Sequence, residues 1–595
     1  IEIKNFKWMI VTAIIHLKLK RKLKINRKYM IAKQLIEPKS IVVVGGSDDI
    51  HKPGGTVLRN LQDGNFKGSL YVGNPKMDEV QGIKAYRDVK DLPEVDCAIL
   101  AIAAKFCPST VEVLAKQKNT KAFIILSSGF HEENEEGAKL ERQIVETINS
   151  VGGSLIGPNC IGVLTNHYSG VFTSPIPELN PQGVDLISGS GATALFIMDS
   201  GMQKGIKFNS MYSVGNSAQL GVEEILEYMD ESFDPKTSSR VKLLYVESIE
   251  KPEKLLKHAS SLIRKGCRIA AVKSGGSAAG SRAASSHTGA LASSDVAVEA
   301  LFRKAGIVRC NGRDELMTVA GIFMHPEMKG RNMAVVTHAG GPAVMLTDAL
   351  SNGGMDVPHI EGEKAQELLG KLFAGSSVGN PIDFLATGTA EQLGYILDAC
   401  DRDFDNIDGM AVIFGSPGLF PVFDVYNVLD EKMKTSKKPI FPIFPSSKIV
   451  KDEIAEFVSK GCVYFPDEVL FGNALCKIYK TPAPQPEHFE MPDMDVKKIR
   501  EVVDNAQNGY LSPDEIHALL DAAGVARAKE GVSDNEEEIV KMAKEIGFPL
   551  VMKVVGPIHK SDVGGVVLNV SDEETVRREF NRMMQIKDTY AIMLA

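Results

Sequence analysis

From residue 40 onward, short apolar runs rich in β-branched residues alternate with longer amphipathic stretches. The first runs read SIVVVGG, SLYVGN, CAILAIA, AFIILSSG and GSLIGPN. Nearly continuous apolar strands joined by helical crossovers are typical of a parallel sheet that is covered by helices on both faces. The pattern therefore predicts an α/β chain made of doubly wound domains.

Two further groups of strands follow the first. The second group contains GVDLISGSGATA, FNSMYSVGNSA, VKLLYVESI and CRIAAVKSGG, and the third contains NMAVVTHAGGPAVM, GMAVIFGSPG and KPIFPIFPS. A proline- and acid-rich segment, residues 480–495, predicts a linker. After it, Ser512, Pro513 and Glu515 form a favourable helix start. A chain of 595 residues is too long for one core, and typical domain sizes suggest about four domains.

The composition indicates which kinds of binding partner are not expected for the protein. Apolar residues make up 44% and charged residues 24%, as in ordinary globular proteins. Residues 1–29 carry nine basic residues against Glu2, and this leaves a charge of −16 on the rest of the chain. An acidic body has no general attraction for nucleic acid. No apolar run is long enough to span a membrane, so we expect neither a nucleic-acid nor a membrane partner.

The eight cysteines are scattered and contain no CxxC pair. This spacing indicates a reducing compartment and argues against a disulfide framework or a zinc site. We therefore expect a cytoplasmic protein and predict no metal-ligating residues.

Residues 1–29 have an apolar stretch followed by a basic run, which is the reverse of the order in a signal peptide. Met30 stands just before a sensible domain start. We expect this leader to lie outside the fold, with a basic segment on a membrane surface as the alternative.

The first glycine turn, GGSDDIHKPGG, connects a strand to the helical TVLRNLQDG. In doubly wound folds such a turn binds phosphates or nucleotides, although it also serves packing alone. The GxGxxG fingerprint is absent, so the turn indicates a Rossmann-like domain without specifying NAD.

Two later segments share one design. ISGSGATALF (187–196) and THAGGPAVML (337–346) each predict a strand, a turn of small residues and a helix. Each would leave free backbone N–H groups at a helix N-terminus, where an anion can approach. Together they suggest a phosphate held between two helix dipoles. The predicted phosphate-binding residues are Gly189, Ser190, Gly191, Ala192, Gly340 and Gly341.

Between these turns, SSHTGALA (285–292) places His287 among small residues. One interpretation is a loop histidine before a capped helix. The other is a phosphoryl acceptor, since imidazole is nucleophilic when neutral near pH 7. The second role requires a carboxylate or carbonyl that holds the ring in one tautomer.

SSHTGALA, the two glycine-rich helix starts and HKSDVGGV together resemble the ADP-forming acyl-CoA synthetases of single-chain type, in the succinyl-CoA synthetase superfamily. The resemblance covers about residues 36–595. It implies a Rossmann-like CoA-binding domain, two flavodoxin-like doubly wound domains and the N-terminal part of an ATP-grasp domain. The expected parts are a leader (1–29), the CoA-binding domain (30–165), the ligase domain with the phosphohistidine (166–325), the second flavodoxin-like ligase domain (326–480), a linker (481–497) and the partial ATP-grasp domain (498–595).

The resemblance assigns catalytic roles to three residues. His287 carries the phosphoryl group between acyl phosphate and nucleotide, and Glu247, in YVESIE, hydrogen-bonds this histidine. His559, on a mobile loop, takes the phosphoryl group at the nucleotide site and passes it to His287. The alternatives are a surface carboxylate for Glu247 and an inert loop histidine for His559.

The resemblance also assigns ligand-binding residues. The CoA-contacting loops VVGGSDD, NPK and LSSGF, followed by GPNCIGV, contribute the residues Gly45, Gly46, Ser47, Lys76, Ser127, Ser128 and Asn159. Lys76 meets a CoA phosphate, or else is a solvated turn lysine, and Asn159 orients the pantetheine arm. Lys553, on the apolar strand FPLVMKVV, lies against the phosphates of ATP or ADP, which binds with Mg²⁺.

Two departures from the family pattern stand out. His338 occupies a position where the family tends to have asparagine. Fewer residues follow the linker than an ATP-grasp fold needs, and the metal-binding carboxylates normally lie further on. We expect either an incomplete sequence or a second chain that supplies the remainder.

The implied reaction converts acyl-CoA, ADP and phosphate reversibly into free acid, CoA and ATP, in a cytoplasmic homodimer. Acetate is the default acid because it is the commonest in the family. The alternatives are a CoA-binding sensor or protein acyltransferase without ligase activity, and an NAD-dependent dehydrogenase. Succinyl-CoA synthetase is the nearest neighbour in chemistry, but the single-chain order and His559 argue against it. No residue specifies the acyl group or distinguishes ADP from GDP.

Overall fold

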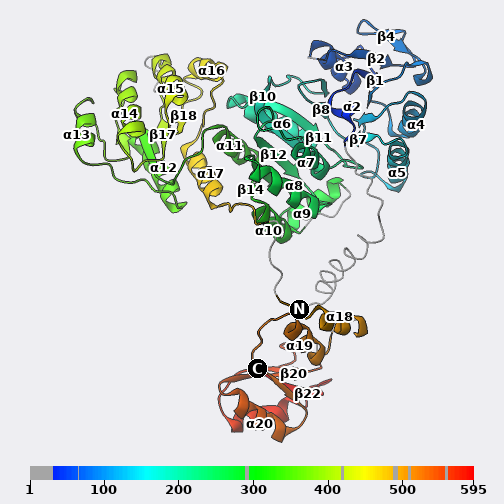
Figure 1. Ribbon diagram of the computed structural model, residues 1–595, viewed down its shortest axis with the longest axis vertical. Coiled ribbons are helices and arrows are strands. Elements are labelled where there is room, and N and C mark those ends of the chain that lie inside the picture. Colours follow the sequence, from blue (N-terminus) through cyan, green and yellow to red (C-terminus); the bar gives the residue numbers. More distant parts are fainter. Residues whose placement is uncertain are drawn as a thin grey trace. The chain divides into compact units, whose positions relative to one another are not determined.

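The computed structural model describes residues 31–64, 66–288, 294–416, 421–486, 493–506, 511–556 and 560–595; the side chains of 284–288 and of Pro513 lie outside the described part. The chain divides into two compact units that part between Gln485 and Pro486. The first unit holds three sheets and the second holds one (Figure 1).

The first sheet has seven strands in the order β3-β4-β2-β1-β5-β6-β7, and only β3 runs antiparallel to its neighbour. The strands are β1 (Ser40–Val44), β2 (Ser69–Gly73), β3 (Glu79–Val80), β4 (Ile83–Tyr86), β5 (Cys97–Leu100), β6 (Ala122–Ile125) and β7 (Ser154–Ile156). The helices are α2 (Lys33–Ile36), α3 (Pro53–Asp63), α4 (Cys107–Gln117) and α5 (Glu135–Ser150).

Side chains alternate across β1, and this alternation places helices on both faces. Ile41 and Val43 share a core with α3, whereas Val42 and Val44 share another with α4 and α5. A strand that is apolar at successive positions is buried on both sides, as the SIVVV run predicts.

The second sheet follows the order β14-β13-β12-β10-β11-β8-β9. Its strands are β8 (Gly162–Leu164), β9 (Ser169–Val171), β10 (Leu179–Ser188), β11 (Phe208–Ser213), β12 (Val241–Val246), β13 (Arg268–Lys273) and β14 (Val308–Cys310). Its helices are α6 (Gly191–Gln203), α7 (Val222–Glu231), α8 (Pro252–Arg264), α9 (Ala278–Thr288), α10 (Asp295–Ala305) and α11 (Arg313–Met324). Strand β8 pairs antiparallel with both β9 and β11, and the strands from β11 to β14 pair in parallel.

The third sheet, β16-β15-β17-β18, is parallel throughout. It contains β15 (Met333–Thr337), β16 (Ile382–Asp383), β17 (Gly409–Ile413) and β18 (Ile440–Ile443). Its helices are α12 (Gly340–Asn352), α13 (Glu363–Leu369), α14 (Ala390–Arg402), α15 (Phe423–Thr435), α16 (Lys451–Ser459) and α17 (Glu468–Lys480). Helix α17 packs against both α11 and α12, so one apolar core joins the second and third sheets.

The second unit has an antiparallel sheet in the order β19-β22-β20-β21. It contains β19 (Gly531–Ser533), β20 (Leu550–Val555), β21 (Val566–Val570), β22 (Ala591–Leu594), α18 (Val496–Asn505), α19 (Pro513–Ala522), α20 (Glu536–Ile546) and α21 (Glu573–Met583). The predicted helix start at Ser512 is confirmed, because its hydroxyl accepts from the Glu515 N–H at 3.3 Å while a Glu515 carboxylate oxygen accepts from the Ser512 N–H at 2.8 Å.

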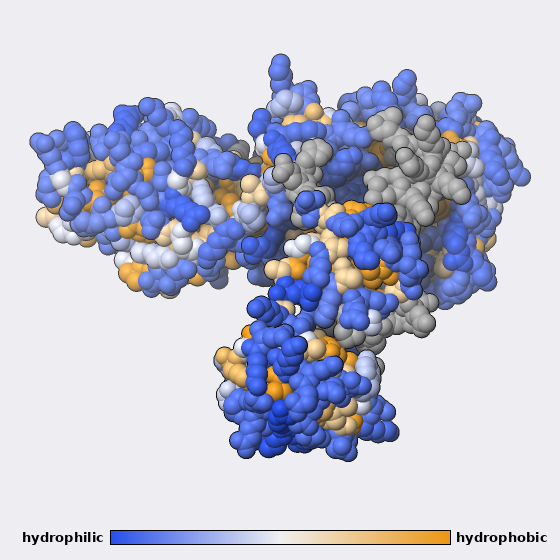
Figure 2. Space-filling view, turned by 60° about the horizontal axis from the view of Figure 1, so that its bottom comes forward, coloured by the Kyte–Doolittle hydropathy of each residue, from blue (hydrophilic) through white to orange (hydrophobic). Residues whose placement is uncertain are grey.

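The sheets and their helices confirm the predicted α/β class. None of the helices in the described part is long and apolar enough to cross a membrane. All eight cysteines are buried and free. On the face shown in Figure 2, hydrophobic residues gather in small groups among hydrophilic ones.

Candidate active site

A cavity of about 680 Å³ lies where loops of the first sheet meet loops of the second. Leu126 and His131 follow β6, and Glu141 lies on α5. The start of α6, the loop after β11 and the end of β12 form further parts of the wall. Loops at the carboxyl ends of parallel strands are the usual place for ligands in doubly wound folds.

The start of α6 brings four predicted phosphate-binding residues, Gly189 to Ala192, into the lining. Ser190 is the N-cap, and its hydroxyl accepts from the Thr193 N–H at 3.4 Å. A Cβ on Gly191 would lie 2.6 Å from Cγ2 of Ile161, so glycine lets the turn pack closely on that side chain. The Gly191 and Ala192 N–H groups of the first turn have no acceptor within the helix and are suited to an anion.

Glu247 lines the same cavity, just beyond the end of β12. Its carboxylate is half-buried and accepts from the Tyr245 hydroxyl at 3.4 Å. The backbone of His287 belongs to α9, but its side chain lies outside the described residues. The structure therefore brings Glu247 together with the α6 start, and the contact between Glu247 and His287 stays a prediction.

The other predicted phosphate-binding pair, Gly340 and Gly341, begins α12 and is exposed. Neither residue lines the cavity described above. A Cβ on Gly341 would meet nothing within 4 Å. The start of α12 is thus an open helix terminus that does not line this cavity.

The predicted CoA loops of β1 and β2 are held together at the carboxyl edge of the first sheet. Gly45 has a φ of 88°, and a Cβ there would lie 2.4 Å from the Ala101 carbonyl oxygen. The Asn74 amide donates to the Gly46 carbonyl at 2.9 Å and accepts from the Lys76 N–H at 2.9 Å. This contact sets the exposed Lys76 beside the turn that contains Ser47.

Asn159 connects the CoA loops to the cavity. Its N–H donates to the Ser127 carbonyl at 2.9 Å, and its side-chain amide donates to Oδ1 of Asn216 at 3.3 Å. Ser128 is exposed beside Ser127. Of the seven predicted CoA-binding residues, Asn159 alone lines the cavity.

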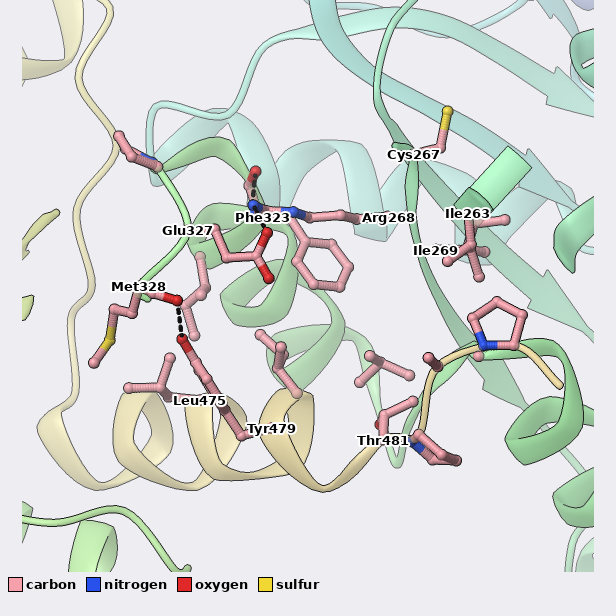
Figure 3. A pocket seen from close by; sticks show the side chains of 18 of the residues that line it. Ile263, Cys267, Arg268, Ile269, Phe323, Glu327, Met328, Leu475, Tyr479 and Thr481 are labelled. Carbon is pink, nitrogen blue, oxygen red and sulfur yellow. Dashed lines mark hydrogen bonds and ion pairs between the residues drawn. The ribbon is translucent and has the colours of Figure 1, made fainter. Parts of the chain in front are cut away.

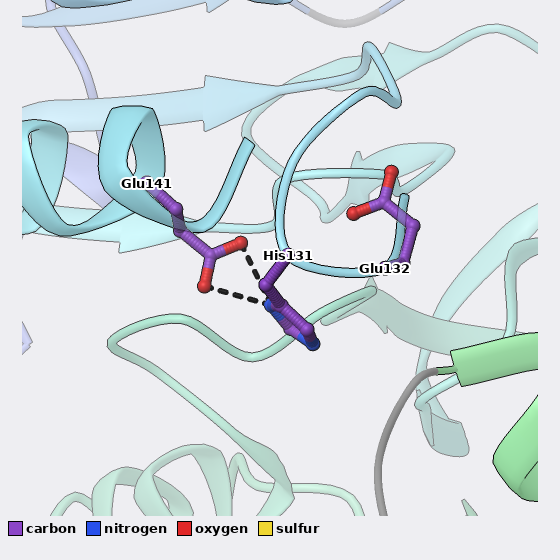
Figure 4. A group of neighbouring side chains, drawn as sticks. All are labelled: His131, Glu132 and Glu141. Atoms are coloured by element: carbon purple, nitrogen blue, oxygen red, sulfur yellow. Dashed lines mark hydrogen bonds and ion pairs between the residues drawn. The ribbon is translucent and has the colours of Figure 1, made fainter. Parts of the chain in front are cut away.

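Sequence reasoning missed a polar group at the cavity wall (Figure 4). Nδ1 of His131 lies 2.8 and 2.9 Å from the two carboxylate oxygens of Glu141. The amide of Asn216 donates to Oε2 of Glu141 at 3.2 Å and also to Glu132. The sequence signal was a histidine within the acidic run FHEENEE after β6, but the run alone does not show which carboxylate meets the ring.

Hydrogen bonds and burial shift the pKa values of His131 and Glu132, two members of this polar group. The hydrogen bond with Glu141 raises the pKa of His131, and partial burial opposes that change. Burial favours a higher pKa for Glu132, but hydrogen bonds from Asn216 and the Gly129 N–H hold it below its ordinary value. Ligand atoms of His131, Glu132 and Glu141 lie within 4.8 Å of one another, and the hydrogen bonds above account for that arrangement.

In the second unit, Lys553 is half-buried on β20. Burial, and then the charge of nearby Lys553, lower the pKa of Lys560. Two neighbouring ammonium groups are suited to phosphates, and sequence reasoning named Lys553 but not Lys560. His559 lies outside the described residues.

A second cavity, of about 330 Å³, lies between the second sheet and α17 (Figure 3). Its lining is largely apolar, with Phe323 under the Arg268 guanidinium and the Tyr479 hydroxyl donating to the Met328 carbonyl at 3.2 Å. No predicted site residue lines it.

Family models match three parts of the chain. A CoA binding domain matches residues 39–166, a succinyl-CoA ligase like flavodoxin domain matches 181–323, and an ATP-grasp domain matches 502–591. These matches confirm the predicted fold class and identify CoA and ATP or ADP as the nucleotide ligands.

Similar proteins extend over most of the chain. The ADP-forming acetate–CoA ligase I of Archaeoglobus fulgidus is 32% identical over 567 residues, which cover 93% of this chain and 80% of that protein. The ADP-forming 4-hydroxybutyrate–CoA ligase of Nitrosopumilus maritimus is 29% identical, with the same coverage of both chains.

A solved structure agrees with these relatives. Acetyl-coenzyme A synthetase 1 of Ca. Korarchaeum cryptofilum, determined with phosphate and ADP, superposes with a TM-score of 0.67 at 27% identity, covering 75% of this chain and 96% of that one. Family membership makes this an acid–thiol ligase, as predicted, rather than a dehydrogenase. The chain belongs to the ADP-forming acyl-CoA synthetase family.

Proposed function

We propose that the protein interconverts acyl-CoA, ADP and phosphate with free acid, CoA and ATP. One observation carries this proposal: a single cavity is lined by Asn159, by Glu247 and by the helix start Gly189–Ala192. The family resemblance assigns Asn159 to the pantetheine arm and Glu247 to the contact with the phosphorylated histidine, and the helix start is predicted from its sequence to bind the phosphate.

Acetate is the proposed acid, because the Archaeoglobus relative is named as an acetate–CoA ligase. The Nitrosopumilus relative is named for 4-hydroxybutyrate, so the acyl group needs a direct test.

The residues that line the cavity suggest the order of the reaction steps. Phosphate bound at the Gly191 and Ala192 N–H groups attacks the thioester carbonyl and forms an acyl phosphate. His287 then takes the phosphoryl group and releases the carboxylate. Glu247 holds the imidazole in one tautomer and stabilises its charged form. Gly340 and Gly341 are proposed to contact the same phosphate from the second helix start.

His559 is proposed to carry the phosphoryl group to ADP, with Lys553 against the nucleotide phosphates. Mg²⁺ is proposed as the counter-ion of these phosphates. In the described part of the second unit, no three His, Cys, Asp or Glu side chains gather into a cation site. The described residues of this unit thus offer no cluster of protein ligands for Mg²⁺, which would be held mainly through the nucleotide phosphates.

A homodimer in the cytoplasm is proposed as the setting. The homodimer rests on the family resemblance alone. The location is supported by eight buried, unpaired cysteines, which suit a reducing compartment.

The test is a half-reaction without nucleotide. The protein is incubated with ³²P-labelled inorganic phosphate and a panel of acyl-CoAs, and acid-labile label on the chain is measured. We expect label with acetyl-CoA, its loss in His287→Ala, and its retention in the control His359→Ala, whose side chain is 71% exposed. If CoA binds but no acyl-CoA produces label, the chain is a CoA-binding sensor or acyltransferase instead.

A further inference from the structure

A histidine–carboxylate pair lies in the proposed reaction cavity, and the proposed function does not yet use it. His131 and Glu141 both line the cavity, together with Asn159 and the α6 start. Asn216 connects this pair to Asn159 through two hydrogen bonds. Its amide nitrogen donates to Glu141 at 3.2 Å, and its amide oxygen accepts from Asn159 at 3.3 Å. Figure 4 shows the imidazole extending from its loop with Nδ1 towards Glu141. In the described part of the chain, Nε2 of His131 has no partner.

The proposed reaction needs a proton at the CoA sulfur. Cleavage of a thioester leaves a thiolate on CoA, and the reverse reaction must remove a proton from the CoA thiol. A group that transfers this proton must touch the sulfur and must titrate near neutral pH.

The other titratable groups in the described wall are less suited. Burial raises the pKa of the Cys160 thiol to about 12. The Glu223 carboxylate already accepts from the Glu250 and Lys251 N–H groups, at 2.9 and 3.0 Å. Glu250 is exposed, and Glu247 is assigned to His287. Glu132 and Glu141, the acids nearest to His131, are hydrogen-bonded carboxylates and serve as acceptors.

We propose that His131, oriented by Glu141, is the catalytic acid and base for the CoA sulfur. The inference rests on the proposed function. As a phosphate oxygen bonds to the thioester carbon, the C–S bond breaks and its electron pair goes to sulfur. Sulfur then takes the proton from Nε2, which leaves a neutral imidazole whose Nδ1–H still donates to Glu141. In the reverse direction Nε2 accepts the thiol proton as sulfur attacks the acyl phosphate and phosphate departs.

Glu141 fixes the pH range of this step. Its hydrogen bond favours the imidazolium and raises the pKa of His131 above its ordinary value. The protonated form needed for thioester cleavage therefore persists to higher pH. Replacing the carboxylate by an amide removes this support and lowers the pH at which cleavage slows.

Two labelling reactions, which both end in labelled His287, distinguish proton transfer at the CoA sulfur from the later phosphoryl transfer. Labelled phosphate with acetyl-CoA requires thioester cleavage, whereas ³²P-labelled acetyl phosphate bypasses it. We expect His131→Gln to slow the first route about 100-fold, as for loss of a general acid or base. The second route should run at the wild-type rate, which also shows that the variant is folded.

Glu141→Gln is the second variant, and pH is its readout. In this variant we expect the rate of labelling from acetyl-CoA to fall at a lower pH than in the wild type as pH is raised. His359→Gln should leave this pH dependence unchanged. Equal slowing of both routes by His131→Gln, or an unchanged pH profile in Glu141→Gln, would overturn the proposal. Failure of both routes in the wild-type protein would instead overturn the proposed function.

Discussion

The starts of α6 and α12 share one backbone design in two different surroundings. In each, a hydroxyl at the end of the preceding strand bridges the turn. The Ser188 hydroxyl donates to the Ser190 carbonyl at 2.7 Å and accepts from the Ser190 N–H at 3.2 Å. The Thr337 hydroxyl does the same with Ala339, at 2.8 and 3.0 Å.

The side chains on these two turns differ. Ser190 caps α6, whereas Ala339 has no side chain that can cap α12. Thr193 supplies an N–H in the first turn of α6, and Pro342, at the same place in α12, has none. The α6 start lines a cavity with Glu247, while the α12 start is open. A repeated turn therefore does not by itself make two equal anion sites, because the surroundings decide what each one binds.

The strands that lead into the two turns differ as well. Aligned on the bridging hydroxyls, Asp185 of β10 corresponds to Ala334 of β15, and both are buried. Asp185 forms an ion pair with Lys242 of β12 and accepts from Ser210 at 2.6 Å. The sheet that carries the cavity thus contains a buried charge pair where the third sheet has a methyl group.

Breaking that charge pair gives the largest expected effect. Lys242→Met leaves the Asp185 carboxylate buried without its counter-ion, which costs roughly 3–5 kcal/mol of unfolding free energy. Denaturant unfolding of the full chain measures the loss.

Two controls sharpen this prediction. The double variant Asp185→Leu with Lys242→Met should recover most of the loss, because an apolar pair resembles the third sheet at this position. Lys116→Met breaks an exposed ion pair with Glu112 and should change the unfolding free energy by less than about 1 kcal/mol. If Lys242→Met is as mild as Lys116→Met, the buried pair is not an essential part of the second sheet.

A carboxylate placed in each first turn tests the two anion sites directly. Ala192 is exposed, and a Cβ on Gly341 is unobstructed, so Ala192→Asp and Gly341→Asp both fit. At α6 the new charge lies where phosphate binds, and a like charge at about 4 Å costs enough to slow labelling about 100-fold or more. At the open α12 start we expect Gly341→Asp to slow labelling only about tenfold, because the phosphate keeps its contacts with the α6 start.

Labelling with ³²P-phosphate and acetyl-CoA measures both variants, and thermal unfolding confirms that both remain folded. Acidic residues in the first turn favour a helix, so neither variant should lose stability. Equal losses would show that the two helix starts hold phosphate as equal partners. An active Ala192→Asp protein would contradict the assignment of the cavity.

Much of the fold was predictable because it depends on local apolar runs. SIVVV, CAIL, VKLLYV and RIAAVK are strands as predicted, and residues buried on both faces need no partner information to be recognised. The β8–β9 hairpin was not predicted. Its strands have only three residues each, which is too short for a periodic pattern to be recognised.

Site residues could be predicted from the sequence where they directly follow a strand. They could not be predicted where the site depends on contacts between distant segments. Gly189–Ala192 and Glu247 lie directly after β10 and β12, and both reach the cavity. The contact between His131 and Glu141 joins a loop to a helix, and Asn216 bonds Glu141 from 75 residues away. Tertiary packing alone creates such contacts, and a local pattern does not reveal them.

His338, the departure from asparagine in the α12 turn, gives the smallest expected effect. Its ring stacks on Phe414 with centroids 4.4 Å apart, and burial lowers its pKa. His338→Asn should cost about 1 kcal/mol of unfolding free energy at pH 8, because the ring contact is lost. The folded chain favours the neutral ring, so below the ordinary histidine pKa of about 6.5 the unfolded chain takes up a proton that the fold resists. Wild-type stability therefore contains a component that is lost as pH falls below that value and that the variant lacks. Unfolding at pH 8 and pH 5.5 should show the gap between the two proteins narrowing in acid, and a gap independent of pH would contradict a buried neutral His338.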